Sequence, residues 1–408
     1  MISEGAKAPP SISRYGDEQT GESPLETKIK SEAFQKFCEA TAGIMNPEVE
    51  AWKQAGGKVI GYFCSTVPEE LFTAAGLLPF RMRGTGSTST ELSDGCFSNI
   101  NCSYPRHTMN EALLGNYDFL DGLVCINSCD HVRRIYDNWI TQLGTPFVQV
   151  MSLPRKVEAP QVDWYCDEIN LLRGQLQEHF GVEISDERLR EAIKLHNEIR
   201  ELQKKVYECR KSDAPPLSGA ETLPIMVAGL SMPKERYKTL LQQFLGDLEK
   251  LEGGGNHRAR LMVVGGELDD PEFMEVIEEQ GGIVVTDSTC FGTRLMWRPV
   301  DESVDDPVRA LASYYIYDRP SCPRMYGDQP RRMDYIQELA KEFRVDGIIG
   351  ERLIFCDQWL VEHYMTGMDL KEAEIPFLQL DREYIMGGKG QLRTRVQAFL
   401  ETIEGMRS

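Results

Sequence analysis

The first half of the chain alternates short apolar runs with segments of helical periodicity. Short apolar runs predict strands at residues 58–63, 77–81, 118–126 and 147–151. Helical patterns lie between them, starting at Pro68 and again at His131. Strands that alternate with helices are typical of a parallel sheet covered by helices on both faces.

The apolar positions change to a helical spacing in the middle of the chain. Ile169, Leu172 and Leu176 recur three or four residues apart and predict a long helix. A second long helix is predicted to begin at Ser185, because a serine side chain can cap the first helical turn. We therefore predict a helical segment over residues 160–254, which includes the flexible Gly253-Gly-Gly sequence near its end.

The alternating pattern returns in the second half and completes the predicted fold. The predicted strands cover residues 260–264, 282–286, 346–349 and 375–380, and the predicted helices cover residues 271–280, 331–344 and 391–403. The predicted class is α/β, with two doubly wound parallel-sheet domains and a helical segment between them. The predicted boundaries are 1–55 for a polar N-terminal arm and helix, 56–159 for α/β domain I, 160–254 for the helical segment and 255–408 for α/β domain II.

Composition and charge exclude several classes of partner. The 408 residues carry a formal net charge of −19, which argues against nucleic acid as a partner because phosphate binding needs basic residues. No apolar stretch approaches the roughly 18 residues of a membrane span. Residues 1–27 are polar and lack the pattern of a secretory signal. We therefore expect a cytoplasmic protein with a disordered N-terminal arm.

Six of the eleven cysteines stand where an apolar run gives way to a loop or to the start of a helix. They are Cys64, Cys102, Cys129, Cys290, Cys322 and Cys356. Loops at the carboxyl ends of parallel strands converge on one crevice, so thiols from distant segments are placed to share one soft metal centre. An iron–sulfur site, commonly held by four thiolates per cubane, is the leading hypothesis.

The spacing and surroundings of the cysteines narrow this hypothesis. The chain contains no CxxC pair, which makes zinc ribbons and dithiol redox motifs improbable. Cys129, Cys322 and Cys356 are predicted to lie at helix N-termini, where unpaired amide hydrogens favour the thiolate. The alternative for any cysteine is a small buried apolar side chain. We assign that alternative to Cys38, Cys125, Cys166 and Cys209, and we give Cys96 low weight.

Several segments resemble one known superfamily, that of the 2-hydroxyacyl-CoA dehydratases and benzoyl-CoA reductases. The resemblance covers nearly everything after residue 35, and its motifs are specific in combination and in this order. They are Gly61-Tyr-Phe-Cys-Ser-Thr-Val-Pro-Glu-Glu-Leu-Phe-Thr-Ala-Ala-Gly, Asn101-Cys-Ser-Tyr-Pro-Arg, Asp121-Gly-Leu-Val-Cys-Ile-Asn-Ser-Cys-Asp, Val345-Asp-Gly-Ile-Ile, Phe355-Cys-Asp and Gly390-Gln-Leu-Arg-Thr-Arg-Val-Gln-Ala-Phe-Leu-Glu.

The resemblance implies a fold, a cofactor and a source of electrons. It implies two flavodoxin-like domains and an oxygen-sensitive [4Fe-4S] cluster on three cysteines, which match Cys102, Cys129 and Cys356 by motif. It also implies a separate ATP-hydrolysing iron–sulfur activator protein that delivers single low-potential electrons. The chain itself has no GxxxxGK[ST] loop, because Gly387-Gly-Lys-Gly does not fit that pattern.

The superfamily divides into two groups, and the sequence leaves both open. One group, radical dehydratases and reductases of acyl-CoA thioesters, works with a homologous second subunit or as a dimer. A sister group resembles this chain at all six cysteines, which carry a double-cubane [8Fe-9S] cluster in reductases of small molecules. In that case Cys64, Cys290 and Cys322 would hold the second half of the cluster.

Two further residues are candidates for the chemistry. Glu70, to which the family motif points, could take a proton from the substrate or tune an iron ligand, or it could only stabilise a helix N-terminus. Ser65 could bond a substrate or cap the same helix. A non-catalytic electron carrier and a metal-free binding protein remain alternatives. The sequence does not reveal the acyl group or whether the reaction is a dehydration or a reduction.

Overall fold

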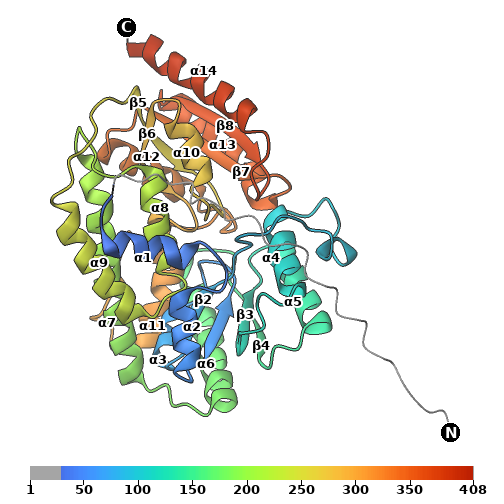
Figure 1. Ribbon diagram of the computed structural model, residues 1–408. Helices are drawn as coiled ribbons and strands as arrows, with labels where there is room; N and C mark the ends of the chain where they lie inside the picture. Colours follow the sequence, from blue (N-terminus) through green and yellow to red (C-terminus); the bar gives the residue numbers. More distant parts are fainter. Residues whose placement is uncertain (1–28, 408) are drawn as a thin grey trace. The chain divides into compact units, whose positions relative to one another are not determined.

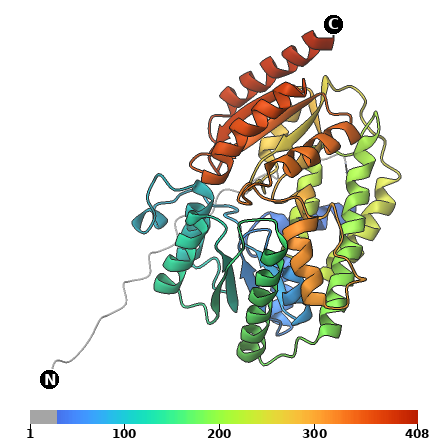
Figure 2. The ribbon, with the colours of Figure 1, turned by 180° about the vertical axis from the view of Figure 1, so that it is seen from behind.

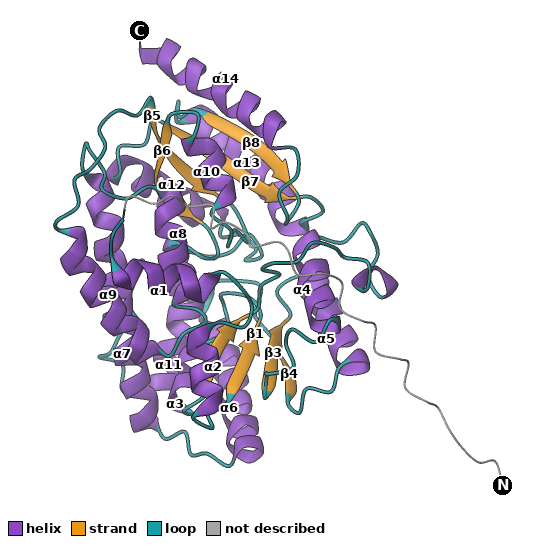
Figure 3. Ribbon diagram, in the orientation of Figure 1, coloured by secondary structure: helices purple, strands orange, loops and turns teal. Residues whose placement is uncertain are grey.

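Two four-stranded parallel sheets form the framework of the computed structural model, which describes residues 29–407 (Figures 1 and 3). The first sheet has the order β2-β1-β3-β4 and the second has the order β6-β5-β7-β8. The strands are β1 (Val59–Tyr62), β2 (Leu78–Arg81), β3 (Gly122–Ile126), β4 (Val148–Met151), β5 (Ala259–Val264), β6 (Gly282–Ser288), β7 (Gly347–Leu353) and β8 (Phe377–Arg382). The predicted α/β class with parallel sheets is confirmed.

Burial along the strands explains why the sequence forms parallel sheets. Every residue of β1, β2, β3 and β5 is buried, as expected for strands covered on both faces, whereas the edge strands β4 and β8 are partly exposed. In the first sheet Ile60 stands beside Pro79 of one neighbour and Gly122 of the other. The apolar runs in the sequence are therefore the interior of the two sheets.

The strand orders place the loops of interest at one location in each sheet. In the first sheet, β2 lies on one side of β1 and β3 lies on the other. In the second sheet, β6 and β7 lie on the two sides of β5 in the same way. Ligands of open α/β sheets bind outside the carboxyl ends of the strands at such a reversal. The strands of both sheets point toward the region between them (Figure 3).

Helices cover the sheets and form the middle of the chain. In the first part they are α1 (Glu32–Thr41), α2 (Pro47–Gln54), α3 (Glu69–Ala74), α4 (Ser103–Leu113), α5 (Asp130–Gln142), α6 (Ala159–Phe180), α7 (Asp186–Glu208), α8 (Gly219–Ala228) and α9 (Lys234–Leu248). The predicted helical segment is confirmed. Ser185 caps α7 as expected, since its hydroxyl accepts a hydrogen bond from the Arg188 backbone N–H at 3.3 Å.

The second part of the chain returns to the first sheet before it completes the second. Its helices are α10 (Glu272–Glu278), α11 (Pro307–Ser313), a π-helical turn (Tyr314–Asp318), α12 (Gln329–Glu342), α13 (Asp357–Glu372) and α14 (Lys389–Arg407). Helix α11 packs against α6 and α7 (Figure 2), and α8 packs against α10 and β6. The proposed domain boundaries remain a prediction, because these helices pack across them. The predicted disordered arm at residues 1–27 lies outside the described residues.

Aromatic and apolar side chains join the two sheets near their carboxyl ends. Leu353 at the end of β7 and Tyr384 after β8 belong to the same buried cluster as Phe63 and Tyr104 of the first half. The Tyr384 hydroxyl donates a hydrogen bond to Asp269 at 2.6 Å. These contacts fix the loops of one sheet against those of the other. None of the helices in residues 29–407 has the length and apolar character needed to cross a membrane.

Candidate metal centre

A single cavity lies where the carboxyl-end loops of the two sheets meet, and all six predicted cysteines line it. The cavity has a volume of about 80 Å³. Its cysteines are Cys64, Cys102, Cys129, Cys290, Cys322 and Cys356. All eleven cysteines of the chain are free thiols. The structure therefore brings together side chains that are up to 292 positions apart in the sequence, Cys64 and Cys356.

Three of these residues, here called the first thiol set, cap helices that begin at the cavity. Cys102 is the N-cap of α4, Cys129 of α5 and Cys356 of α13. The Cys129 sulfur accepts a hydrogen bond from the Val132 backbone N–H at 3.4 Å. Unpaired N–H groups and the positive end of the helix dipole favour negative charge at each of these positions.

The other three residues, here called the second thiol set, lie on loops. Cys64 follows β1 with a left-handed backbone (φ 73°), and Cys290 follows β6. The expected helix N-terminus at Cys322 is wrong, because Pro323 opens a turn and α12 begins only at Gln329. Proline fits a turn as well as the first position of a helix, so the sequence did not distinguish the two.

Cys102 and Cys290 are buried and the other four thiols are half-buried, and this removal from water affects their protonation. It raises the pKa of Cys129 and of Cys356 to about 12, and it raises the pKa of Cys102 and of Cys290 well above the ordinary value. Nearby backbone N–H groups act against burial at all three residues of the first set. These thiols stay protonated unless a cation takes up their negative charge, as a coordinated metal does.

The arrangement suits a group larger than one ion. Among residues 29–407, no three Cys, His, Asp or Glu side chains converge closely enough to hold a single metal ion. The thiols instead surround a space that Leu353, Val132 and Trp359 make partly apolar. Several thiolates around a shielded space are the donor set of an iron–sulfur cluster, so these residues fit such a group.

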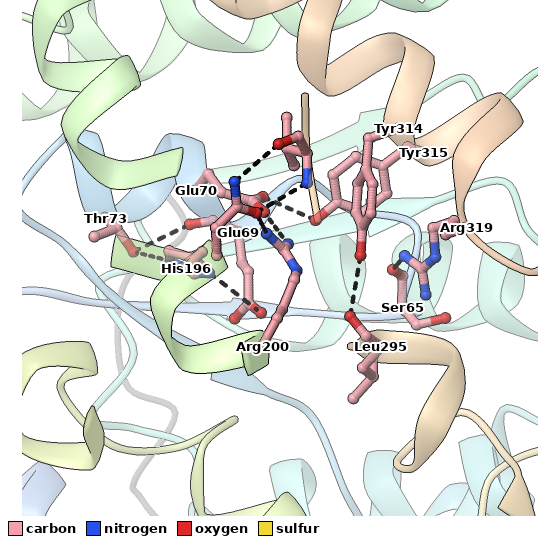
Figure 4. A network of polar contacts seen from close by, with 12 residues as sticks. Ser65, Glu69, Glu70, Thr73, His196, Arg200, Leu295, Tyr314, Tyr315 and Arg319 are labelled. Atoms are coloured by element: carbon pink, nitrogen blue, oxygen red, sulfur yellow. Dashed lines mark hydrogen bonds and ion pairs between the residues drawn. The ribbon is translucent and has the colours of Figure 1, made fainter. Parts of the chain in front are cut away.

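The predicted catalytic residues have different positions. Ser65 lines the cavity, and its carbonyl oxygen accepts a hydrogen bond from Arg319. Glu70 does not line it. Its carboxylate is fully buried, pairs with Arg200 and accepts a hydrogen bond from the Tyr315 hydroxyl at 2.8 Å (Figure 4).

The contacts of Glu70 favour a structural role over the predicted chemical one. Burial alone would raise the pKa of Glu70, but the charge of Arg200, the nearby His196 and hydrogen bonds to the carboxylate together lower the pKa to about 2. A carboxylate that does not line the cavity is poorly placed to accept a proton from a substrate bound there. It holds α3 against α7 instead.

The structure adds a carboxylate that the sequence analysis missed. Glu267 follows β5 and lines the cavity, and both its oxygens accept hydrogen bonds from Arg81, at 2.9 and 3.1 Å. Arg81 is fully buried. The available signal in the sequence was the Gly265-Gly266 pair, which follows a predicted strand and directly precedes Glu267.

His131 and Asp357 complete the polar lining of the cavity. The Cys102 backbone N–H donates to His131 Nδ1 at 3.1 Å, and His131 Nε2 lies 3.4 Å from Asp357 Oδ2. The structure places this ring between the Cys102 backbone and Asp357, the first residue of α13.

Comparisons with known proteins agree with the motif resemblance. A family model described as 2-hydroxyglutaryl-CoA dehydratase, D-component, matches residues 64–403. A benzoyl-CoA reductase subunit from Thauera aromatica is 27% identical over 360 residues, which cover 86% of this chain and 93% of that protein. The (R)-phenyllactyl-CoA dehydratase beta subunit of Clostridium sporogenes is 28% identical over 356 residues, with the same two coverages.

A more distant relative extends the comparison. The (R)-2-hydroxyglutaryl-CoA dehydratase subunit beta of Acidaminococcus fermentans is 22% identical over 377 residues, which cover 91% of this chain and 98% of that protein. These relatives are subunits of dehydratases and of a reductase. The predicted superfamily is therefore confirmed.

Proposed function

This chain belongs to the 2-hydroxyglutaryl-CoA dehydratase D-component family, and from that premise we propose that it is an oxygen-sensitive iron–sulfur subunit that dehydrates or reduces an acyl-CoA thioester. The observation that carries the proposal is the convergence of six cysteines from distant segments on one cavity. Its fold fits two flavodoxin-like halves, since each sheet has the strand order that places a ligand crevice beside its central strand.

Cys102, Cys129 and Cys356 would hold a [4Fe-4S] cluster. Three protein thiolates leave one iron of a cubane open to another ligand, and a bound cluster would supply single electrons and a Lewis acid for a substrate oxygen. The chain's own residues exclude water and provide protons. Trp359 and Leu353 shield the cavity, and we assign proton transfer to Glu267, the half-buried glutamate of its lining.

The electrons would come from a separate protein. We infer a low-potential, ATP-hydrolysing iron–sulfur activator as the one-electron donor, because the family resemblance implies it. The eleven free thiols fit the reducing conditions of the cytoplasm, where we place the protein.

A second subunit of the same fold, either a homologue or a copy of this chain, would complete the enzyme. Three relatives of the chain are named as subunits of enzymes. The exposed face of α13 supports this, since five of its exposed side chains are large and apolar: Leu360, Val361, Tyr364, Met365 and Met368. Apolar patches of this kind on a folded protein mark sites of protein–protein contact.

A double-cubane [8Fe-9S] cluster is the second candidate, and one observation favours it. Cys64, Cys290 and Cys322 line the same cavity as the first thiol set. A subunit with a single cubane on three cysteines would leave these three thiols without a metal. With both sets occupied, the chain would be an ATP-dependent reductase of a small molecule.

Anaerobic iron and sulfide analysis tests the proposal. Cubane stoichiometry predicts about four irons per chain for the single cluster and about eight for the double cubane. Cys129→Ala is expected to lose at least the iron of the first thiol set. Cys125→Ala is the matched control, because Cys125 lies four residues earlier, is buried in β3 and does not line the cavity. A wild-type chain without iron, or a Cys129→Ala variant with full iron content, would refute the proposal.

A further inference from the structure

The two thiol sets face different sources of positive charge. The first set lies at the N-termini of α4, α5 and α13, where the positive charge comes from backbone N–H groups. The second set lies on loops and is approached by arginine side chains. Backbone charge is built into the fold, whereas side-chain charge can be removed by substitution.

Arg294 makes the most direct contact with the second set. It is buried (4% exposed), and its Nη2 donates a hydrogen bond to the Cys290 sulfur at 3.0 Å. The backbone carbonyl oxygens of Gly265 and Thr289 accept hydrogen bonds from the same guanidinium at 2.8 and 3.2 Å. These bonds hold the charge in place, and Trp359 of the cavity wall stacks on it at 5.2 Å.

Arg324 provides a second buried cation near Cys64 and Cys322. Its guanidinium donates hydrogen bonds to Asn127, at 3.2 Å to the backbone oxygen and 3.1 Å to Oδ1. The carbonyl oxygen of Leu153 accepts another at 2.5 Å. Arg324 therefore ties the loop that carries Cys322 to the carboxyl ends of β3 and β4.

Neither charge is neutralised by a carboxylate. Two other buried arginines are neutralised, since Arg81 pairs with Glu267 and Arg332 pairs with Glu362. Within residues 29–407, Arg294 and Arg324 form no ion pair, and their partners are carbonyl oxygens, one amide and one sulfur. Their positive charge therefore acts on whatever occupies the space between the thiols.

We propose that Arg294 and Arg324 are positioning residues that raise the reduction potential of an iron–sulfur group on the side of the second thiol set. The inference rests on the double-cubane form of the proposed function, in which the second thiol set holds iron. Net charge, hydrogen bonds to the sulfurs and burial set the potentials of such groups, and a buried cation stabilises the form with one added electron. Single electrons that enter the cavity from the low-potential donor would therefore settle on this side.

The test is an anaerobic redox titration followed by electron paramagnetic resonance, with dithionite as the reductant. The signal of the second set is the one that Cys290→Ser removes or shifts. Arg294→Gln keeps an N–H donor but removes the charge, and we expect it to shift the reduction equilibrium of that signal at least about tenfold toward the oxidised form. This corresponds to about 59 mV lower for one electron. Arg294→Lys, which keeps the charge, is expected to recover most of the shift.

Arg210→Gln is the matched control. Arg210 is also buried (1% exposed) and donates to the Val284 carbonyl oxygen, and it forms no ion pair among the described residues, but it lies outside the cavity. In Arg210→Gln we expect the signal of the second set to have the same reduction potential as in the wild type. If Arg294→Gln and Arg210→Gln lower the reduction potential equally, the inference is overturned. The shift would then follow from the removal of any buried arginine.

The outcomes separate this inference from the function on which it rests. If Arg294→Gln does not fold, Arg324→Gln removes the second charge without touching the Cys290 contact, and the same downward shift is expected. Unchanged potentials in variants that bind iron would overturn the inference and leave the proposed function intact. A wild-type chain that binds no iron would overturn both.

Discussion

At the scale of single residues, unusual backbone conformations occur at or beside two of the cavity cysteines. Cys64 has a positive φ of 73°, and Phe355, directly before Cys356, has one of 64°. Such conformations are costly for residues other than glycine and persist where the surroundings require them, often at functional sites. Cys125, with all its neighbours in a regular strand, shows no such strain. These two unusual conformations therefore occur where Cys64 and Cys356 line the cavity.

Glu267 is the residue on which the proton chemistry of the cavity depends in our proposal. Glu267→Gln keeps an acceptor for Arg81 but cannot exchange a proton. We expect turnover to fall about 10²- to 10⁴-fold, the usual contribution of a general acid or base. Turnover is measured with the acyl-CoA thioesters after which the relatives are named, and iron content is measured in parallel and should not change.

Glu362→Gln is the control for this substitution. Glu362 likewise pairs with a buried arginine through both oxygens, at 2.7 and 2.8 Å from Arg332, but it does not line the cavity. Both variants lose the charge of a buried pair and should lose similar stability. Equal loss of turnover in the two would show that Glu267 acts only through stability.

The sequence predicted the cysteines better than the acids. Six thiols at the ends of apolar runs follow from strand patterns alone, because the carboxyl ends of parallel strands meet. The role of Glu70 depended on which way its side chain points, and a pattern of residues does not contain that information. The sequence near Glu267 shows only a pair of glycines before it. The contact that distinguishes Glu267 is its hydrogen bond with Arg81, which is 186 positions away in the sequence.

At the scale of elements, the spacing of apolar residues predicted most strands and helices, but it did not predict which elements pack against one another. The predicted segments coincide with β1 to β8 and with the long helices α6 and α7. The packing of α11 on α6 and α7 was not predicted, because an amphipathic face does not reveal which surface covers it. Helix α4 was also missed, since its polar sequence Ser103-Tyr-Pro-Arg-His lacks a clear apolar stripe.

A buried network between α3 and α7 should make the fold sensitive to acid (Figure 4). His196 is buried (4% exposed), its Nε2 lies 2.9 Å from the Thr73 hydroxyl, and burial lowers its pKa from 6.5 to about 4. Between these two values the unfolded chain binds a proton at this residue that the folded chain does not. The free energy of unfolding therefore falls as the pH falls from about 6.5 to about 4.

His196→Gln tests this expectation, because glutamine keeps a hydrogen-bonding side chain without a titrating group. The variant should lose less stability over this pH range than the wild type, by on the order of 2 kcal/mol. Urea denaturation at pH 7 and pH 5 measures the difference, and His179→Gln at an exposed position is the control. Glu70, with its pKa near 2, loses its contribution only below about pH 4.5, so it does not interfere.

At the scale of the whole molecule, the unusual surface feature is the apolar face of α13. The helix begins at Cys356 in the cavity, and its exposed face continues away from it through Val361, Tyr364 and Met368. A partner bound there would lie beside the first thiol set. This links assembly to the proposed chemistry, because a second subunit would help to exclude water and oxygen from the cavity mouth.

Charge placed on this face should therefore break the association. Val361 is 64% exposed on α13, and Leu171 is 57% exposed on α6, away from the cavity, so the two are closely matched. We expect the wild-type chain and Leu171→Glu to sediment as assemblies of two subunits, because a buried unpaired charge is costly only at an interface. Val361→Glu should sediment as a single chain with unchanged helical content. If Val361→Glu and Leu171→Glu associate equally well, the second subunit does not bind at α13, and the closure of the cavity must come from this chain alone.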